Sequence, residues 1–252
     1  MLVDVHAHLD DDAFDPDREE VIQKIKEAGI FVINAGSDLH TSEFSVRLAE
    51  RYDFVYACVG VHPHEARKAP EGYLQILRNL AQSPKVVAVG EIGLDYYYDF
   101  SDREIQKKVF SEQLELAKEV GLPVVVHDRE AHGDTLEILK RSGIKRGLMH
   151  CYSGSYEIAG EFMNMGFYFS FGGPITFKNA KRPKEVAAKL PLEKILLETD
   201  CPYLSPEPYR GKRNDSTRVR VIAEALAHIK GITLQEVEKT TTSNARELFK
   251  LM

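Results

Sequence analysis

Eight short apolar segments of strand length recur along this chain, and a segment with helical spacing follows each of them. Regular alternation of strand and helix is typical of a parallel sheet covered by helices. Eight such units in 252 residues predict an α/β fold whose strands close into a (β/α)8 TIM barrel. We expect residues 1–252 to form this barrel as a single domain. The strands are predicted at 2–5, 30–34, 54–59, 86–89, 122–126, 147–149, 167–171 and 194–197.

Capping residues indicate where the helices begin and end. Ser101 and Glu104 have the spacing of a capping box, and the long helix that follows them should end at Gly121. The run from Thr240 to Ser243 has poor helix propensity, so we expect it to split the last helix.

Six residues that can bind metal follow the predicted strands. Residues two apart on a strand project to the same face, so His6 and His8 can reach one ion. The carboxyl ends of the strands meet at one end of a barrel, where catalytic residues of such barrels lie. The sequence therefore predicts a metal site at that end. Its candidate ligands are His6, His8, Glu91, His127, His150 and Asp200.

Four imidazoles and two carboxylates exceed the roughly three protein ligands that one catalytic zinc takes, so we expect two divalent ions. Glu91 should bridge them because a carboxylate has two oxygens. Mg, Mn, Zn and Ni are the candidate metals. Paired ions activate a water for hydrolysis, and Asp200 is the candidate acceptor of its proton, which makes Asp200 and Glu91 the candidate catalytic residues. The expected division is His6, His8 and Asp200 on one ion and His127 and His150 on the other.

Imidazole and cationic side chains near the same end are candidate substrate contacts. The two histidines after the third strand can bind substrate oxygens or protonate a leaving group; the alternative is a loop stiffened by Pro63 with incidental histidines. Three cations after the eighth strand suit phosphate, because arginine matches its oxygens; the alternative is a solvated charged loop. The candidate substrate-binding residues are His62, His64, Arg129, Lys178, Arg210, Lys212 and Arg213.

Two further groups have open interpretations. The tyrosines at 96–98 either stack on nucleobases or pack beneath a loop. Asp4, two residues before His6, either orients a metal ligand or is buried polar structure. Three more histidines lie in or beside helical segments and are expected at the surface: His40, His132 and His228.

Composition limits where and how the chain acts. The formal charge of −6 gives no global basic field for nucleic acid, so any nucleic-acid binding must be local. No segment has the roughly 20 apolar residues that span a bilayer, and no signal peptide is recognisable, so we expect a cytoplasmic protein without a membrane partner. No obligate protein partner is evident. Cys58, Cys151 and Cys201 lack zinc-binding or redox spacing and are expected to be reduced thiols.

The assembled motifs resemble the TatD family of metal-dependent deoxyribonucleases, which are amidohydrolase-like barrels. The resemblance covers essentially the whole chain. It implies a (β/α)8 barrel, two divalent ions and hydrolysis of DNA phosphodiesters, often from the 3′ end. By motif position it implies the same six metal ligands, with His62, His64 and Arg129 as substrate contacts. The motifs begin at Asp4 (DVHAH), Gly60 (GVHPH), Gly90 (GEIGLDY), Val126 (VHDR), His150 (HCYSG), Glu198 (ETDCP) and Arg210 (RGKRN).

The chain departs from the family pattern at one point. The family more often continues the last motif with Glu-Pro, whereas Asp215-Ser216 follows here. This departure concerns the rim and leaves the predicted metal ligands untouched.

Three functions compete. The leading hypothesis is a deoxyribonuclease that acts on single-stranded or fraying DNA ends, because a recessed barrel mouth admits a flexible strand more easily than a duplex. The alternative is a hydrolase of a small-molecule amide or ester, since a metal-activated water attacks carbonyl carbon as well. A non-catalytic binding protein is disfavoured because no expected ligand is missing.

Overall fold

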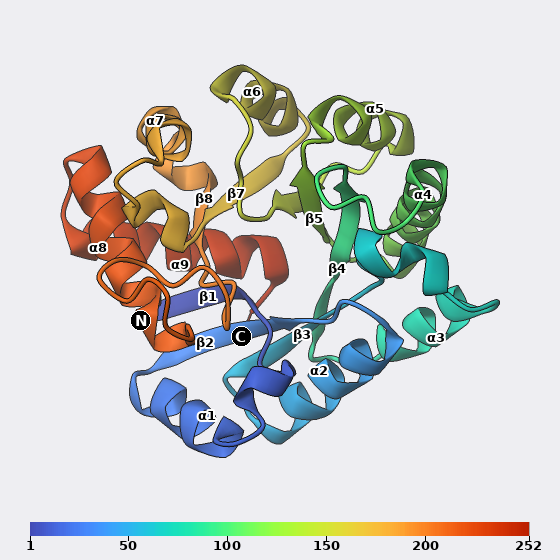
Figure 1. The fold of residues 1–252 in the computed structure, drawn as a ribbon, viewed down its shortest axis with the longest axis horizontal. Coiled ribbons are helices and arrows are strands. Elements are labelled where there is room, and N and C mark those ends of the chain that lie inside the picture. Colours follow the sequence, from blue (N-terminus) through green and yellow to red (C-terminus); the bar gives the residue numbers. More distant parts are fainter. Residues whose placement is uncertain (252) are drawn as a thin grey trace.

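Eight parallel strands form the centre of the computed structural model, which describes residues 1–251 (Figure 1). They pair in sequence order, each with the next, so the predicted (β/α)8 barrel is confirmed. The strands are β1 (Leu2–Ala7), β2 (Ile30–Ala35), β3 (Val55–Val59), β4 (Val86–Asp95), β5 (Val124–Arg129), β6 (Gly147–Met149), β7 (Phe167–Phe171) and β8 (Ile195–Leu197).

Helices surround the strands, and each turns an apolar stripe toward them (Figure 1). In the described chain they are α1 (Arg18–Glu27), α2 (Leu39–Arg51), α3 (Tyr73–Leu80), α4 (Arg103–Val120), α5 (His132–Ser142), α6 (Tyr156–Asn164), α7 (Lys181–Lys189), α8 (Val219–Lys230) and α9 (Leu234–Phe249). Short 3-10 turns join several of them.

The apolar core has two layers. The larger lies between the strands and the surrounding helices. The smaller fills the barrel itself and includes Val3, Val125 and Leu196, which pack with Leu248 and Phe249 of α9. Helix α9 thus closes the end of the barrel that lies behind the strands in Figure 1.

Inside the barrel, a polar residue follows an apolar one within β5 and β7 and just past the ends of β6 and β8. Side chains two apart on a strand face the same way, so the residue two positions after each apolar interior residue also points inward. A polar layer therefore lies directly on the apolar layer, toward the carboxyl ends of the strands. The apolar and polar members are Val125 and His127, Leu148 and His150, Tyr168 and Ser170, and Leu196 and Glu198.

The barrel closes through main-chain contacts just beyond the end of β8. The Asp200 amide donates to the His6 carbonyl at 2.9 Å, and the His8 amide donates to the Cys201 carbonyl at 2.8 Å. Ala7 and Cys201 form a parallel bridge. This closure brings residues from the two ends of the sequence to one point of the barrel mouth.

Several predicted boundaries are wrong. Strands β1, β4 and β5 continue to Ala7, Asp95 and Arg129, so His6, Glu91 and His127 lie within strands rather than after them. Asp102, not Ser101, caps α4, because the Ser101 hydroxyl donates instead to the His64 carbonyl at 3.0 Å. The end of α4 at Gly121 is confirmed.

The last helix is continuous, contrary to the prediction of a break at Thr240 to Ser243. Within that run the Thr241 hydroxyl donates to the Val237 carbonyl at 2.8 Å, and the Thr242 hydroxyl donates to the Met1 carbonyl at 2.9 Å. Burial and these bonds outweigh the low helix propensity of threonine.

In residues 1–251 no helix combines the length and the apolar character that a bilayer crossing requires. The three cysteines are free thiols, as expected. Burial raises the pKa of each thiol, that of Cys58 and of Cys151 well above the ordinary value.

Candidate metal centre

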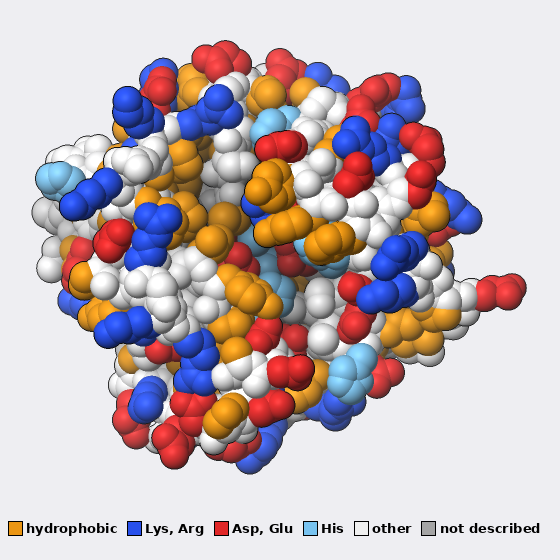
Figure 2. Space-filling model, in the orientation of Figure 1, with side chains coloured by type: hydrophobic (Ala, Val, Ile, Leu, Met, Phe, Trp, Pro, Cys, Tyr) orange, Lys and Arg blue, Asp and Glu red, His pale blue; other side chains and the backbone are white. Residues whose placement is uncertain are grey.

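A pocket of about 670 Å³ opens at the carboxyl ends of the strands, the end opposite α9. Figure 2 shows it as a hollow at the centre of one face, with histidine and acidic side chains at its floor and hydrophobic side chains at its border. The floor includes His8, Glu91, His127, His150 and Asp200, all predicted metal ligands.

The predicted ligands and His62 form three overlapping groups, in each of which the potential ligand atoms lie within 4.8 Å of one another. Each group contains three side chains, and His6 and Glu91 each belong to two groups. This overlap is the arrangement expected of a centre with shared ligands. The groups are His6, His8 and Asp200; His6, Glu91 and His150; and His62, Glu91 and His127.

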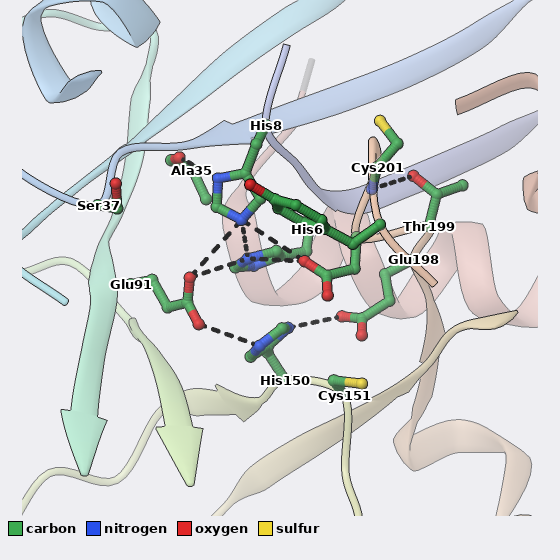
Figure 3. Close-up of polar contacts among 12 residues, drawn as sticks. His6, His8, Ala35, Ser37, Glu91, His150, Cys151, Glu198, Thr199 and Cys201 are labelled. Carbon is green, nitrogen blue, oxygen red and sulfur yellow. Dashed lines mark hydrogen bonds and ion pairs between the residues drawn. The ribbon is translucent and has the colours of Figure 1, made fainter. Parts of the chain in front are cut away.

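Glu91 lies at the centre of these groups. Its Oε2 is 3.3 Å from His6 Nε2, and its Oε1 is 3.1 Å from His150 Nε2 and 2.8 Å from His127 Nδ1. Figure 3 shows His6 and His8 from β1 and its end, Glu91 from β4 and His150 from the end of β6 converging on one point. Both carboxylate oxygens therefore face imidazoles, as the prediction of a bridging carboxylate requires.

The first predicted ligand set is brought together. His8 Nε2 lies 3.5 Å from Asp200 Oδ1, and His6 Nε2 lies 4.0 Å from the same oxygen. In the second predicted set, His127 Nδ1 and His150 Nε2 both lie beside Glu91 Oε1. His150 also groups with His6, and His127 also groups with His62.

His62, predicted to contact substrate, therefore lies within reach of the centre itself. Its Nε2 is 3.5 Å from Glu91 Oε1, and the side chain is buried. Burial lowers the pKa of His62 to about 4, so its ring is neutral at pH 7, the form that binds metal.

The electrostatics of the pocket favour positive charge. Burial alone would raise the pKa of Glu91, but the imidazoles of His62, His150 and His6 hold it well below its ordinary value. Burial and the hydrogen bond with His8 act in opposite directions on Asp200, and its pKa is lowered overall. Both carboxylates are therefore ionised at neutral pH.

The residues present fit a divalent metal centre. His6 Nε2 and His8 Nε2 face one another at 3.2 Å, a separation that calls for a shared proton or cation. Imidazole nitrogens and ionised carboxylate oxygens are the ligand set that zinc, manganese and nickel accept. The fit rests on this donor set and its convergence.

Two buried carboxylates behind the ligands were missed in the sequence. Asp95 Oδ2 lies 3.0 Å from His127 Nε2 and 2.9 Å from His64 Nε2. Glu198 Oε2 lies 3.3 Å from His150 Nδ1 (Figure 3). The same oxygen accepts from the Ser170 hydroxyl at 2.5 Å. Such carboxylates fix the ring orientation and tautomer of a metal-binding histidine.

Asp4 is also buried, but it contacts Thr199, next to Asp200, rather than a ligand ring. It accepts hydrogen bonds from the Thr199 amide at 2.8 Å and the Thr199 hydroxyl at 2.5 Å. It thereby ties β1 to the segment that carries Asp200. Of the three histidines expected at the surface, His40 and His228 are exposed, whereas His132 is half-buried against Asp128.

Aromatic side chains and Arg129 form one wall of the pocket. Tyr98 and Phe100 stack at 5.2 Å between ring centroids and remain about half exposed, at 47% and 53%. The Arg129 guanidinium lies 4.1 Å from the Tyr97 ring centroid and 4.7 Å from that of Tyr98. His64 packs edge-on against Tyr98 and Phe100.

The tyrosines at 96–98 have different environments. The Tyr96 hydroxyl donates to Asp134 at 2.6 Å, which holds this ring against α5. The amides of Tyr97 and Tyr98 donate to Asp95 Oδ1 at 3.0 and 2.8 Å. The packing interpretation therefore holds for Tyr96. Tyr98 instead presents its ring to the metal pocket.

The predicted cations after β8 lie beside the metal pocket, whereas the one after β7 does not line it. Arg210, Lys212 and Arg213 line a neighbouring pocket, and all three are exposed. Arg213 forms a two-pronged ion pair with Asp17, so its guanidinium is already engaged. Lys178 is exposed and lines neither pocket.

Comparison with known proteins identifies the family. The model of the TatD related DNase family matches residues 3–250. The chain belongs to this family. It is a metal-dependent hydrolase, and its resemblance to the TatD family is confirmed.

Full-length relatives agree with this assignment. A Bacillus subtilis (strain 168) protein described as the uncharacterized metal-dependent hydrolase YabD is 47% identical over 100% of both chains. Human deoxyribonuclease TATDN3 is 35% identical over 98% of this chain and 94% of its own. The crystal structure of YJJV, a TatD homolog from Escherichia coli K12, has a TM-score of 0.94 at 33% identity, covering 100% of this chain and 98% of that one.

Proposed function

We propose that this chain is a deoxyribonuclease that uses two divalent ions to cleave DNA phosphodiesters at single-stranded or fraying ends. The observation that carries the proposal is the convergence of three ligand groups on Glu91 and His6 at the floor of one pocket. When bound, paired divalent ions acidify a water and stabilise negative charge on a phosphoryl oxygen. The name of human TATDN3 supports DNA as the substrate class.

Residues of the chain supply the proton acceptor and the phosphate-binding group that the reaction also needs. Asp200, at the edge of the floor, is the candidate acceptor of the proton from the attacking water, because its carboxylate is ionised and its side chain is 16% exposed. Arg129 lines the pocket without an ion pair to any residue in 1–251, so its guanidinium can bind a phosphate. His64 lies on the same wall, beside Phe100.

The aromatic wall favours a substrate with unpaired bases. Tyr98 and Phe100 present stacked, half-exposed rings within the metal pocket. A nucleobase stacks on such a surface regardless of its sequence, and a base inside a duplex has no free face to offer. A small ester or amide gains less from this wall, which is why we place that alternative second.

The test combines metal removal with a panel of substrates. The protein is stripped of divalent metal, restored with Mg, Mn, Zn or Ni in turn, and assayed on 5′-labelled single-stranded DNA, duplex DNA, a chromogenic phosphodiester, an ester and an amide. We expect metal-dependent shortening of the single strand. In Asp200→Asn the rate should fall by about 10²–10⁴-fold, as expected when a proton acceptor is removed.

Asp53→Asn is the matched control, because Asp53 is exposed and precedes β3 at the opposite end of the barrel. It should cleave DNA at the wild-type rate. Intact DNA alongside hydrolysis of the ester or amide would reject the nuclease and leave a metal-dependent hydrolase of small molecules.

A further inference from the structure

A second pocket, of about 540 Å³, opens beside the metal pocket. Asp11, Tyr203 and Leu204 line both pockets, so they form the border between them. Tyr203 is held in place by its hydroxyl, which donates to Asp11 at 2.5 Å. A ligand that fills both pockets must therefore cross this border as two linked units.

The cations of the second pocket are not equivalent. Arg213 is bound to Asp17, at 2.6 and 2.8 Å for the two prongs, and this ion pair occupies its guanidinium. The Arg210 guanidinium instead lies 4.3 Å from the ring centroid of Phe177. Neither Arg210 nor Lys212 forms an ion pair with a carboxylate anywhere in residues 1–251.

An arginine that rests on an aromatic ring keeps its charge and its N–H donors for an external anion. The metal pocket is lined by several carboxylates, whereas the only carboxylate described in the lining of the second pocket is Asp11, which accepts the Tyr203 hydroxyl. Arg210 and Lys212, two cations without an ion pair, line the second pocket. The rest of the lining includes Phe177, Pro202 and Leu204, which are apolar. An anionic group joined to a flat apolar body is the chemistry of a nucleotide, while inorganic phosphate makes no use of the apolar lining.

We propose that the second pocket binds the nucleotide next to the one whose phosphodiester is cleaved, with its phosphate on Arg210 and Lys212 and its base against Phe177 and Leu204. The proposal rests on the proposed nuclease function and deepens it: the substrate is an oligonucleotide held on both sides of Tyr203 and Leu204. Arg213 acts only to position the loop, through Asp17.

The experiment neutralises the one phosphate that the second pocket is proposed to bind. Trinucleotides are prepared with a methylphosphonate, which carries no charge, at the linkage that is not cleaved first. kcat/KM is measured for wild type, Arg210→Ala, Lys212→Ala and Lys239→Ala on the neutralised and the fully charged trinucleotide. Lys239 is an exposed lysine of α9, at the closed end of the barrel, and its replacement is the matched loss of one charge.

In wild type and Lys239→Ala, the methylphosphonate should lower kcat/KM by about 10- to 100-fold, the range for hydrogen bonds to a charged group. In Arg210→Ala and in Lys212→Ala this loss should be smaller than in wild type, because each variant already lacks one of the two contacts to the phosphate. An equal loss in all four proteins, or no loss in wild type, overturns the proposal while leaving the nuclease intact. If wild type cleaves no phosphodiester at all, including a chromogenic one, the proposed function fails and this proposal with it.

Discussion

Glu198 is the buried carboxylate that holds the candidate ligand His150. Its side chain has no exposed surface, and its Oε2 faces His150 Nδ1 and the Ser170 hydroxyl. With Nδ1 turned toward Glu198, the opposite nitrogen, Nε2, points at Glu91 Oε1. The orientation of one ligand ring therefore depends on a carboxylate outside the pocket floor.

Glu198→Gln tests this dependence. The amide keeps the shape of the side chain but loses its charge, so His150 becomes less basic and less firmly oriented. We expect metal affinity to fall by about 10- to 100-fold, as for other partners of metal-binding histidines. The readout is the divalent-metal dissociation constant of the stripped protein, with thermal unfolding to show that the variant folds.

Glu185→Gln, an exposed carboxylate on α7, is the matched control and should bind metal as wild type does. Undiminished metal affinity in Glu198→Gln would mean that His150 is held by its packing alone.

Asp95 and Glu198, the two carboxylates behind the ligands, were not predicted from the sequence, whereas the ligands themselves were. His6, His8 and Asp200 follow from residue type and strand-end position, and the structure brings them together. Asp95 and Glu198 resemble ordinary residues at strand ends. The signal that was available is a carboxylate in an otherwise buried apolar run, because a buried charge requires a partner.

At the scale of secondary structure elements, the close approach of β4 and β5 fixes the position of His127. Gly93 pairs with His127 across these strands and has a φ of 145°. A side chain at Gly93 would collide with the His127 carbonyl oxygen. The glycine therefore allows β5 to lie where its histidine reaches Glu91.

Gly93→Ala should lower the free energy of unfolding by about 1–3 kcal/mol or more, because alanine is strained in this backbone conformation. The displaced His127 should also weaken metal binding. Gly160→Ala on α6 is the matched control, because nothing lies near its added carbon, and it should stabilise the helix by about 0.5–1 kcal/mol. Urea unfolding of both variants measures the difference, and a Gly93→Ala protein as stable as wild type would rule out this account.

The presence and order of the helices and strands were predicted better than the residues at which they begin and end. Periodicity identified the eight strands and the long helix that ends at Gly121. The cap of that helix and the continuity of α9 escaped prediction, because both depend on partners distant in sequence. The Ser101 hydroxyl is used by His64 and the Thr242 hydroxyl by Met1, and no local pattern reveals either bond.

At the scale of the whole molecule, the two ends of the barrel have separate tasks. Helix α9 packs Leu248 and Phe249 into the smaller core layer at the closed end. The polar layer and the metal pocket occupy the opposite end, where Tyr98 and Phe100 remain half exposed. Barrels of this kind carry stability at one end and chemistry at the other.

Two phenylalanine variants should separate these tasks. Phe249→Ala removes a buried ring, so unfolding should become easier by about 3–5 kcal/mol, the usual range for such truncations in a core. Its kcat/KM on single-stranded DNA at a temperature where it is folded should match that of wild type. Phe100→Ala removes an exposed ring, so its stability should change by no more than about 0.5 kcal/mol.

The activity of Phe100→Ala on single-stranded DNA should fall by about 5-fold or more, because a stacked base is worth roughly 1–3 kcal/mol. Its rate on a substrate without bases should not change. Urea unfolding and kcat/KM are measured on both variants. Phe249→Ala should lose stability and keep its activity, whereas Phe100→Ala should lose activity and keep its stability. Equal losses of stability and activity in both variants would show that the two ends are coupled through the apolar layer between them.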